Sequence, residues 1–243
     1  MQYLLRYKII PAIFFIVFSP VLGFSQLRDG INQSDHDEKD FHFGIYIGIN
    51  RSHFNFTHHP LFLQRDSVMV VESVNSTGLN LAWLVEKRIS DHFAIRTFPL
   101  DLTFTEKAFE YVLKYPDRVG GEDTLTTKKV QSISMSLPVQ LKFCSDRIGN
   151  FKVYMLGGLK AEYDMAANAG ARKAENLIKL NRFDYGIEAG LGFHFYYPYF
   201  VLTPEIKMGW GLSNLHSRDP NLKFSNVIDK VNSRTVTFSI TVE

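Results

Sequence analysis

Apolar and polar residues alternate along most of the chain after residue 40. From Phe41 to Asn50 every odd position is a bulky apolar residue, and every even position is small or carries a polar group. Successive side chains of a β-strand point to opposite faces, so this pattern predicts a strand with one apolar face. The phase slips near Phe98-Pro99, as a β-bulge would cause. We predict eight strands, at 41–50, 79–86, 92–108, 132–143, 150–164, 183–195, 199–212 and 235–242.

The connections between these strands alternate between short and long. The short turns are 89–91, 145–149 and 197–199. The long loops are 57–76, 109–125, 165–180 and 213–230. An even number of antiparallel strands with all short turns at one end is typical of outer-membrane barrels, whose short turns are periplasmic and whose long loops are extracellular. We predict an all-β fold, an eight-stranded antiparallel transmembrane outer-membrane β-barrel with both of its ends in the periplasm.

The less apolar face of the predicted strands is rich in glycine and charged residues. An eight-stranded barrel encloses an interior just wide enough for ordinary side chains. Bulky residues such as Trp83 and Phe183 would overfill it, so we expect them to face lipid. A soluble lipocalin-like barrel is the alternative, since its sheet also has one apolar face. The predicted interior polar network, structural and ion-paired, comprises Glu86, Arg96, Asp101, Lys142, Lys160, Glu162, Asp164, Asp184, Glu188, His194, Glu205 and Lys207.

Aromatic residues gather near the two ends of the predicted strands. Tyr163 and Trp210 lie near the long loops. A second group lies near the short turns: Phe143, Phe151, Phe193, Phe195, Tyr197, Tyr199 and Phe200. Two aromatic girdles, one at each membrane interface, are expected of a spanning barrel.

The first 25 residues have the pattern of a secretory signal peptide. Arg6 and Lys8 precede an apolar stretch, and small residues, Gly23 and Ser25, precede a cut before Gln26. We therefore predict a signal peptide at 1–25, a flexible acidic periplasmic lead-in at 26–40 and a barrel domain at 41–243. The signal holds two basic residues and no acid, so the remaining chain is formally neutral. Neutrality argues against nucleic acid as a partner.

No residue pattern points to catalysis or to a cofactor. Cys144 is the only cysteine, which excludes an internal disulfide and a cysteine-based metal site. His58 and His59 lie near Asp66, but adjacent histidines on an extended chain diverge, so we expect no metal. Asp184 and Glu188 would lie about 13 Å apart on one face, too far for a carboxylate pair acting on one bond.

A series of short motifs in 41–215 resembles the PorT family of Bacteroidetes outer-membrane barrels (SprT in gliding bacteria). The motifs are Pro99-Leu100-Asp101-Leu102-Thr103-Phe104-Thr105-Glu106-Lys107 with Tyr111, Leu137-Pro138-Val139-Gln140-Leu141-Lys142-Phe143, Asn150-Phe151 with Tyr154, Gly157-Gly158, Tyr163-Asp164, Asp184, Glu188, Gly190, Gly192, Tyr197-Pro198-Tyr199-Phe200, Pro204-Glu205-Ile206-Lys207, and Gly211-Leu212 with Asn214. Two inward positions depart from the family pattern: Ser136 stands where an acid is expected, and His194 where Asp is expected.

The resemblance implies a part in the type IX (Por) secretion system, which exports proteins across the outer membrane and supports gliding motility. On this basis we expect a non-enzymatic accessory without an aqueous pore. Its expected partners are other outer-membrane or periplasmic secretion components, the lipid bilayer and lipopolysaccharide. Two alternatives remain: a passive structural or adhesive barrel, and an enzyme that modifies lipid A, for which His194 and the loop serines were considered.

Overall fold

The computed structural model describes residues 30–60, 68–116, 123–166, 180–217 and 227–243. The predicted signal peptide, Asp66 and the central parts of the four predicted long loops lie outside the described residues. The chain divides into two units, Met1–Asn32 and Gln33–Glu243. Everything described below belongs to the second unit.

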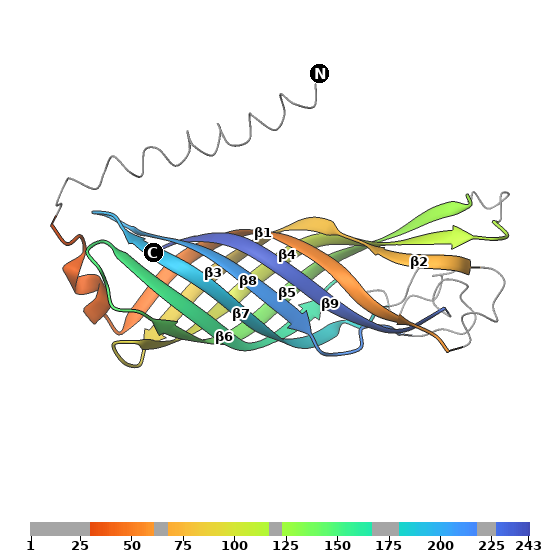
Figure 1. Cartoon of the computed structure of the whole chain (residues 1–243). Helices are drawn as coiled ribbons and strands as arrows, with labels where there is room; N and C mark the ends of the chain where they lie inside the picture. The colour runs from red at the N-terminus through yellow and green to blue at the C-terminus, as the bar shows by residue number, and fades with distance from the viewer. Residues whose placement is uncertain (1–29, 61–67, 117–122, 167–179, 218–226) are drawn as a thin grey trace, which may run out of the picture. The chain divides into compact units, whose positions relative to one another are not determined.

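Within its described residues the second unit contains nine β-strands and one short 3-10 helix (Figure 1). The helix is η2 (Ser34–Glu38). The strands are β1 (Phe41–His58), β2 (Val68–Val74), β3 (Ser76–Arg88), β4 (Phe93–Leu113), β5 (Leu125–Cys144), β6 (Phe151–Asp164), β7 (Phe183–Tyr196), β8 (Val201–Gly211) and β9 (Ile228–Val242). All the strand pairings are antiparallel.

Eight of the nine strands close into a ring. The sheet order is β2-β4-β3-β1-β9-β8-β7-β6-β5, and a further pairing of β4 with β5 closes it. β2 is the ninth strand; it ends just before β3 begins and continues alongside β4 beyond the end of the β3–β4 pairing. The described strands therefore confirm an all-β antiparallel barrel with eight strands in its wall. Because the ring is closed, each of its eight strands is paired on both sides, and the wall has no open edge with unpaired backbone groups along these pairings.

The short turns lie at one end of the barrel, as predicted. They join β3 to β4, β5 to β6 and β7 to β8, and β1 begins and β9 ends at the same end. We call this the short-turn end. At the opposite end four strands extend further than predicted. β1 runs to His58, β4 runs to Leu113, β5 begins at Leu125 and β9 begins at Ile228. Parts of the segments expected to be loops are therefore paired strand.

The predicted bulge in β4 is present. The register with β5 shifts between Thr97 and Asp101, next to the proline at position 99. Arg96 is buried before the shift, Phe98 within it and Asp101 after it. The extra residue moves the inward face from even to odd positions, which is why alternation appears broken in the sequence.

The wall is apolar outside and polar inside. Outward side chains are large and exposed, among them Trp83 at 59% and Phe183 at 72%. Inward side chains include charged residues that are almost fully buried, such as Arg96 at 1% and Lys142 at 2%. A barrel dissolved in water has the opposite arrangement, since exposing so many large apolar groups to water is unfavourable. Lipid is therefore the solvent that this wall fits.

The apolar-out pattern reverses near the end opposite the short turns. On β1 the exposed outward residue Ile49 is followed by the outward residues Arg51 and His53, while the buried inward residues change from Ser52 to Phe54. On β9, outward Val236 gives way to Arg234, and these residues pair with Arg51 and His53. The reversal at one height on adjacent strands marks where the wall leaves the membrane.

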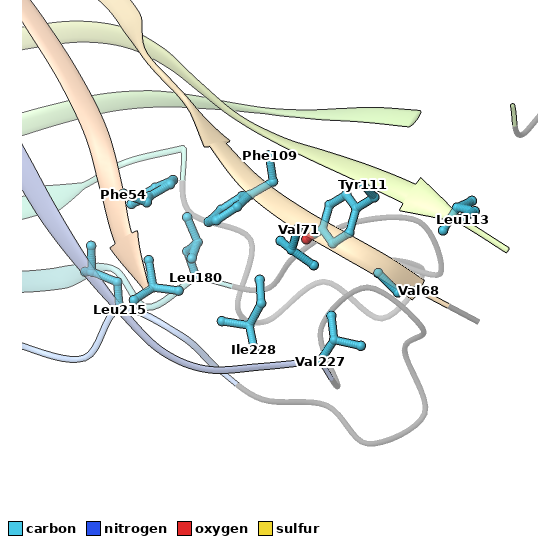
Figure 2. Close-up of a cluster of buried hydrophobic side chains, with 11 residues drawn as sticks. Phe54, Val68, Val71, Phe109, Tyr111, Leu113, Leu180, Leu215, Val227 and Ile228 are labelled. Atoms are coloured by element: carbon cyan, nitrogen blue, oxygen red, sulfur yellow. The ribbon is translucent and has the colours of Figure 1, made fainter. Parts of the chain in front are cut away.

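Beyond this reversal the described strand ends enclose an apolar core. We call this core the head cluster. Phe54 of β1 stacks on Phe109 of β4 with ring centroids 5.1 Å apart. Side chains from β1, β2, β4 and β9 point toward one another there (Figure 2). The head cluster comprises Phe54, Val68, Val71, Phe109, Tyr111, Leu113, Leu180, Leu215, Val227, Ile228 and Val231.

Candidate functional site: the barrel interior and its short-turn mouth

The middle of the barrel interior is crossed by a buried ion pair. The Arg96 guanidinium on β4 lies 2.6 Å from the Glu205 carboxylate on β8, and about 1% of either side chain is exposed. The Tyr154 hydroxyl donates a 2.6 Å hydrogen bond to the same Glu205 oxygen. Arg96 Nε also donates to Gln140 at 2.9 Å. Gly192 leaves room for this tyrosine, because a Cβ at that position would collide with the Tyr154 hydroxyl.

A second centre of the interior is the carboxylate of Glu188. It accepts a 2.6 Å hydrogen bond from Gln140 Nε2. The ammonium of Lys207 lies 3.4 Å away and that of Lys160 lies 3.9 Å away. Lys160 also pairs with Glu162 at 2.8 Å. Gln140 joins this centre to Arg96, so the two centres form one connected set of contacts.

Further polar contacts fill the two ends of the interior. Toward the short turns, Lys142 Nζ contacts both oxygens of Glu86 at 2.9 and 2.8 Å. Toward the head, Asp184 accepts hydrogen bonds from Ser213 and, at 2.8 Å, from Ser233. Asp184 and Glu188 thus have separate partners and do not converge on one point.

The twelve residues of the predicted interior network all lie on the inner side of the wall. Nine are buried and three, Lys160, Glu162 and Asp164, are half-buried. Asp164 accepts a 2.8 Å hydrogen bond from Ser132. The two departures from the family pattern are also integrated, because Ser136 donates to Asp101 at 2.7 Å and His194 Nδ1 lies 2.8 Å from the Thr203 hydroxyl.

Sequence reasoning missed three inward residues that contribute to this interior. Gln140 and Tyr154 were not assigned to it, although they link its charged groups. Lys107 is also buried, and its ammonium lies 4.8 Å from the centre of the Phe54 ring at the base of the head cluster. The shifted phase after the β4 bulge would have assigned Lys107 inward.

The interior is densely filled. Its cavities near Asp101 and near Asp184 have volumes of about 30 and about 20 Å³. A site of this size holds single water molecules rather than a solute.

The short-turn end has a larger, open cavity of about 250 Å³, which we call the mouth. The segment 33–40, which we call the plug, contributes His36 and Asp37 to its lining. The Asp37 carboxylate contacts Arg147 at 3.1 Å and Lys152 at 3.0 Å, and it accepts a 2.9 Å hydrogen bond from the Tyr196 hydroxyl. In contrast to the flexible lead-in expected from the sequence, residues 34–38 form the 3-10 helix η2, which these contacts attach to the wall.

Three titratable groups of the mouth have pKa values shifted from their ordinary values. Burial and the neighbouring His42 lower the pKa of His36 to about 4. Hydrogen bonds from Lys152 and Arg147 outweigh burial and lower the pKa of Asp37. Burial raises the pKa of Glu243, which follows β9, to about 7. His36 is therefore neutral and Asp37 is charged near neutral pH, so Asp37 is the acid that holds the plug.

The described residues offer little chemistry for a metal or a nucleophile. No group of three His, Cys, Asp or Glu side chains in the described part of the chain is placed to hold a metal ion. Cys144 is buried and lines the mouth. His194 is buried against Thr203 rather than beside a serine and an acid.

A closed antiparallel ring with an apolar outer wall and a charged, filled interior defines a membrane-spanning β-barrel. The family comparison agrees: residues 24–217 match the model of the outer membrane protein beta-barrel domain family, and the chain belongs to that family. It is accordingly an outer-membrane protein. No helix among the described residues is long and apolar enough to cross a membrane.

Solved structures with a similar fold have little sequence identity to this chain. Neisserial surface protein A is 11% identical, with a TM-score of 0.42, and the match covers 84% of this chain and 99% of that one. Ail of Yersinia pestis, in complex with a heparin analogue, is 13% identical with a TM-score of 0.40, covering 84% and 99%. OprG of Pseudomonas aeruginosa is 13% identical with a TM-score of 0.42, covering 84% and 94%. No curated protein matches the sequence.

Proposed function

We propose that this barrel is a non-enzymatic accessory of the type IX (Por) secretion and gliding machinery. The assignment to that machinery rests on the PorT-like motifs, which recur in order along 41–215. The filled interior supports a role other than conduction, because Arg96 meets Glu205 across the lumen and Gln140 links Arg96 to Glu188. In this proposal the chain is exported by a signal peptide, and its short-turn end faces the periplasm.

A barrel with a filled lumen cannot pass a polypeptide, so a secretion role uses its outer surfaces. Three surfaces are available: the apolar wall, the head with its long connections, and the mouth with the plug. Long connections often carry function. We propose that the head and its connections contact a larger outer-membrane partner, while the interior network keeps the wall rigid.

The test is a secretion and gliding assay in a deletion strain complemented with two sets of variants. One set shortens each connection within 61–67, 117–122, 167–179 or 218–226. The other set neutralises an interior pair, as in Glu188→Gln with Lys207→Gln. Surface proteolysis and gel mobility establish that each variant is inserted and folded. We expect at least one shortened variant to abolish secretion while inserted interior variants secrete normally.

The opposite pattern, in which every shortened variant secretes and inserted interior variants fail, contradicts the role of the head. The two alternatives give other outcomes. A passive structural or adhesive barrel leaves secretion intact when the gene is deleted. An enzyme acting on lipid A changes the acyl pattern of lipid A, which mass spectrometry of the deletion and complemented strains detects.

A further inference from the structure

The plug is held by three side chains that the barrel wall supplies. Arg147 lies in the turn after β5, Lys152 lies on β6 and Tyr196 ends β7. All three contact the Asp37 carboxylate within 3.1 Å. The Arg147 guanidinium also lies 3.6 Å from the centre of the Tyr196 ring, which fixes its orientation. We call these three residues the cradle; two cations and a phenol hydroxyl form a site for a carboxylate.

The plug that fills the cradle carries no aliphatic side chain, and its one ring, His36, stacks on His42 with centroids 4.4 Å apart and meets Tyr196 edge-on at 5.7 Å. None of the residues of η2 is buried. Besides Asp37, the plug makes polar contacts: Gln33 Nε2 donates to the Tyr197 carbonyl at 2.8 Å, and the His42 ring lies 2.8 Å from the His36 carbonyl. The Gln33 carbonyl accepts from Arg147 at 3.2 Å, and the Asp40 carbonyl accepts from the Arg88 N–H at 2.8 Å. Asp37 keeps 30% of its side chain exposed. Ion pairs that water reaches contribute little each, so these contacts can be exchanged for those of a competing acid.

The wall behind the cradle is held far more firmly. Arg147, Lys152 and Tyr196 belong to paired strands or to the turn between them, and their places are set by the barrel. Detachment of the plug therefore leaves the cradle in place, with two cations no longer matched by Asp37. It also widens access to the mouth, whose volume of about 250 Å³ has room for the side chains that flank a bound acid.

We propose that the cradle is a docking site for an acidic peptide segment of a periplasmic partner, and that Asp37 is the resident occupant which the partner displaces. The plug sequence Ser-Asp-His-Asp-Glu shows the kind of segment that fits, an acid in a short polar turn. This inference goes beyond the secretion role and is independent of which machinery the barrel serves. Only the periplasmic location of the partner follows from the proposed orientation.

The chain carries its own reporter for the position of the plug. Cys144 is its only cysteine, lies in the lining of the mouth and is 7% exposed. The rate at which a maleimide modifies Cys144 in the purified full chain, in detergent at fixed pH, measures access to the mouth. Mass spectrometry counts the modified protein, and gel mobility shows that the barrel is folded.

The first experiment compares Asp37→Asn with Asp35→Asn, a matched change in the same helix. Asp37→Asn weakens the contacts with both cradle cations, so we expect Cys144 to react about fivefold to tenfold faster than in the wild type. Asp35→Asn is expected to react at the wild-type rate. High salt should accelerate the wild-type reaction and leave Asp37→Asn nearly unchanged. Equal rates for both variants and the wild type contradict the proposal that Asp37 holds the plug at the mouth.

The second experiment adds a synthetic peptide of residues 33–40, with blocked ends, to the Asp37→Asn barrel. We expect the peptide to return the Cys144 rate toward that of the wild type, and the same peptide carrying Asp37→Asn to have little effect. Adding Lys152→Met to the barrel should abolish protection. Equal protection by both peptides, or by inorganic phosphate alone, overturns the assignment to an acidic peptide. None of these results depends on secretion, so the proposed function stands or falls separately.

Discussion

At the scale of single residues, the interior depends on matched charges placed where water is scarce. Arg96 on β4 and Glu205 on β8 are 109 residues apart in the sequence and meet across the lumen. Taking two charges out of water is costly, and their attraction offsets that cost only while both remain. The pair therefore adds little net stability to the folded barrel. Losing one member is costly, because it leaves the other charge buried without a partner.

We predict that Glu205→Gln destabilises the folded barrel by about 3–5 kcal/mol, because it leaves the Arg96 cation buried without its partner. The double variant Arg96→Gln with Glu205→Gln should recover a large part of that loss, since both groups are then neutral and can still hydrogen-bond. Urea unfolding of the protein in lipid vesicles gives the free energies for the double-mutant cycle. If the two single losses simply add in the double variant, the pair is not coupled.

The inward positions of these residues could be predicted from sequence, but their partners could not. Alternation with a period of two assigns Glu188 and Lys207 to the inner face whatever the details of the barrel. Which inward residue meets which across the lumen depends on the tilt and stagger of the wall, and the local pattern does not contain these. Gln140 and Tyr154 were missed for the same reason, because their importance lies in what they contact.

At the scale of elements, the strands that extend beyond the membrane show that the surrounding solvent, lipid or water, decides which face of a strand is apolar. On β4 the inward residues change from Arg96 and Asp101 to Phe109, Tyr111 and Leu113. The side chains still alternate beyond this point, but the apolar ones now face inward. Strands identified by their apolar outer face therefore end too early. The predicted loops 57–76, 109–125 and 213–230 therefore hold paired strand, including the whole of β2, that apolar-out alternation does not reveal. The plug was missed for a different reason: a polar segment held by one acid has no periodic signal.

Phe109 tests whether the head folds as a unit beyond the barrel. It is fully buried in the head cluster, where it stacks on Phe54 and packs edge-on against Phe56. Phe109→Ala removes about 3–5 kcal/mol of local packing. We expect faster amide hydrogen exchange in β2 and in the end of β4, while the barrel keeps its folded gel mobility.

The matched control is Phe104→Ala, five residues earlier on the same strand. Phe104 is 41% exposed on the outer wall and pairs with Leu79 and Ile133 in the described sheet. Its loss removes contact with lipid and leaves the head cluster intact, so exchange in β2 should stay at the wild-type level. Equal acceleration in both variants would show that β2 responds to the stability of the whole barrel instead.

At the scale of the whole molecule, the barrel is sealed in its middle and open at its short-turn end. The mouth of about 250 Å³ leads toward an interior whose cavities are about 30 and about 20 Å³. Between them lie the contacts of Glu86 with Lys142 and of Arg96 with Glu205. The plug and the interior network are thus two separate barriers, one held by a partly exposed acid and the other by buried pairs.

This separation leads to a prediction about conduction. The pure wild-type protein in a planar bilayer should form no stable open channel, because water-sized cavities bounded by buried ion pairs exclude hydrated ions. Asp37→Asn should be equally silent, even though it exposes Cys144, since freeing the plug leaves the pairs of the middle in place. A porin reconstituted in the same membranes shows that insertion and detection work. A steady conductance from the wild type contradicts a sealed interior, and a conductance that arises only with Asp37→Asn makes the plug, rather than the buried network, the barrier to ions.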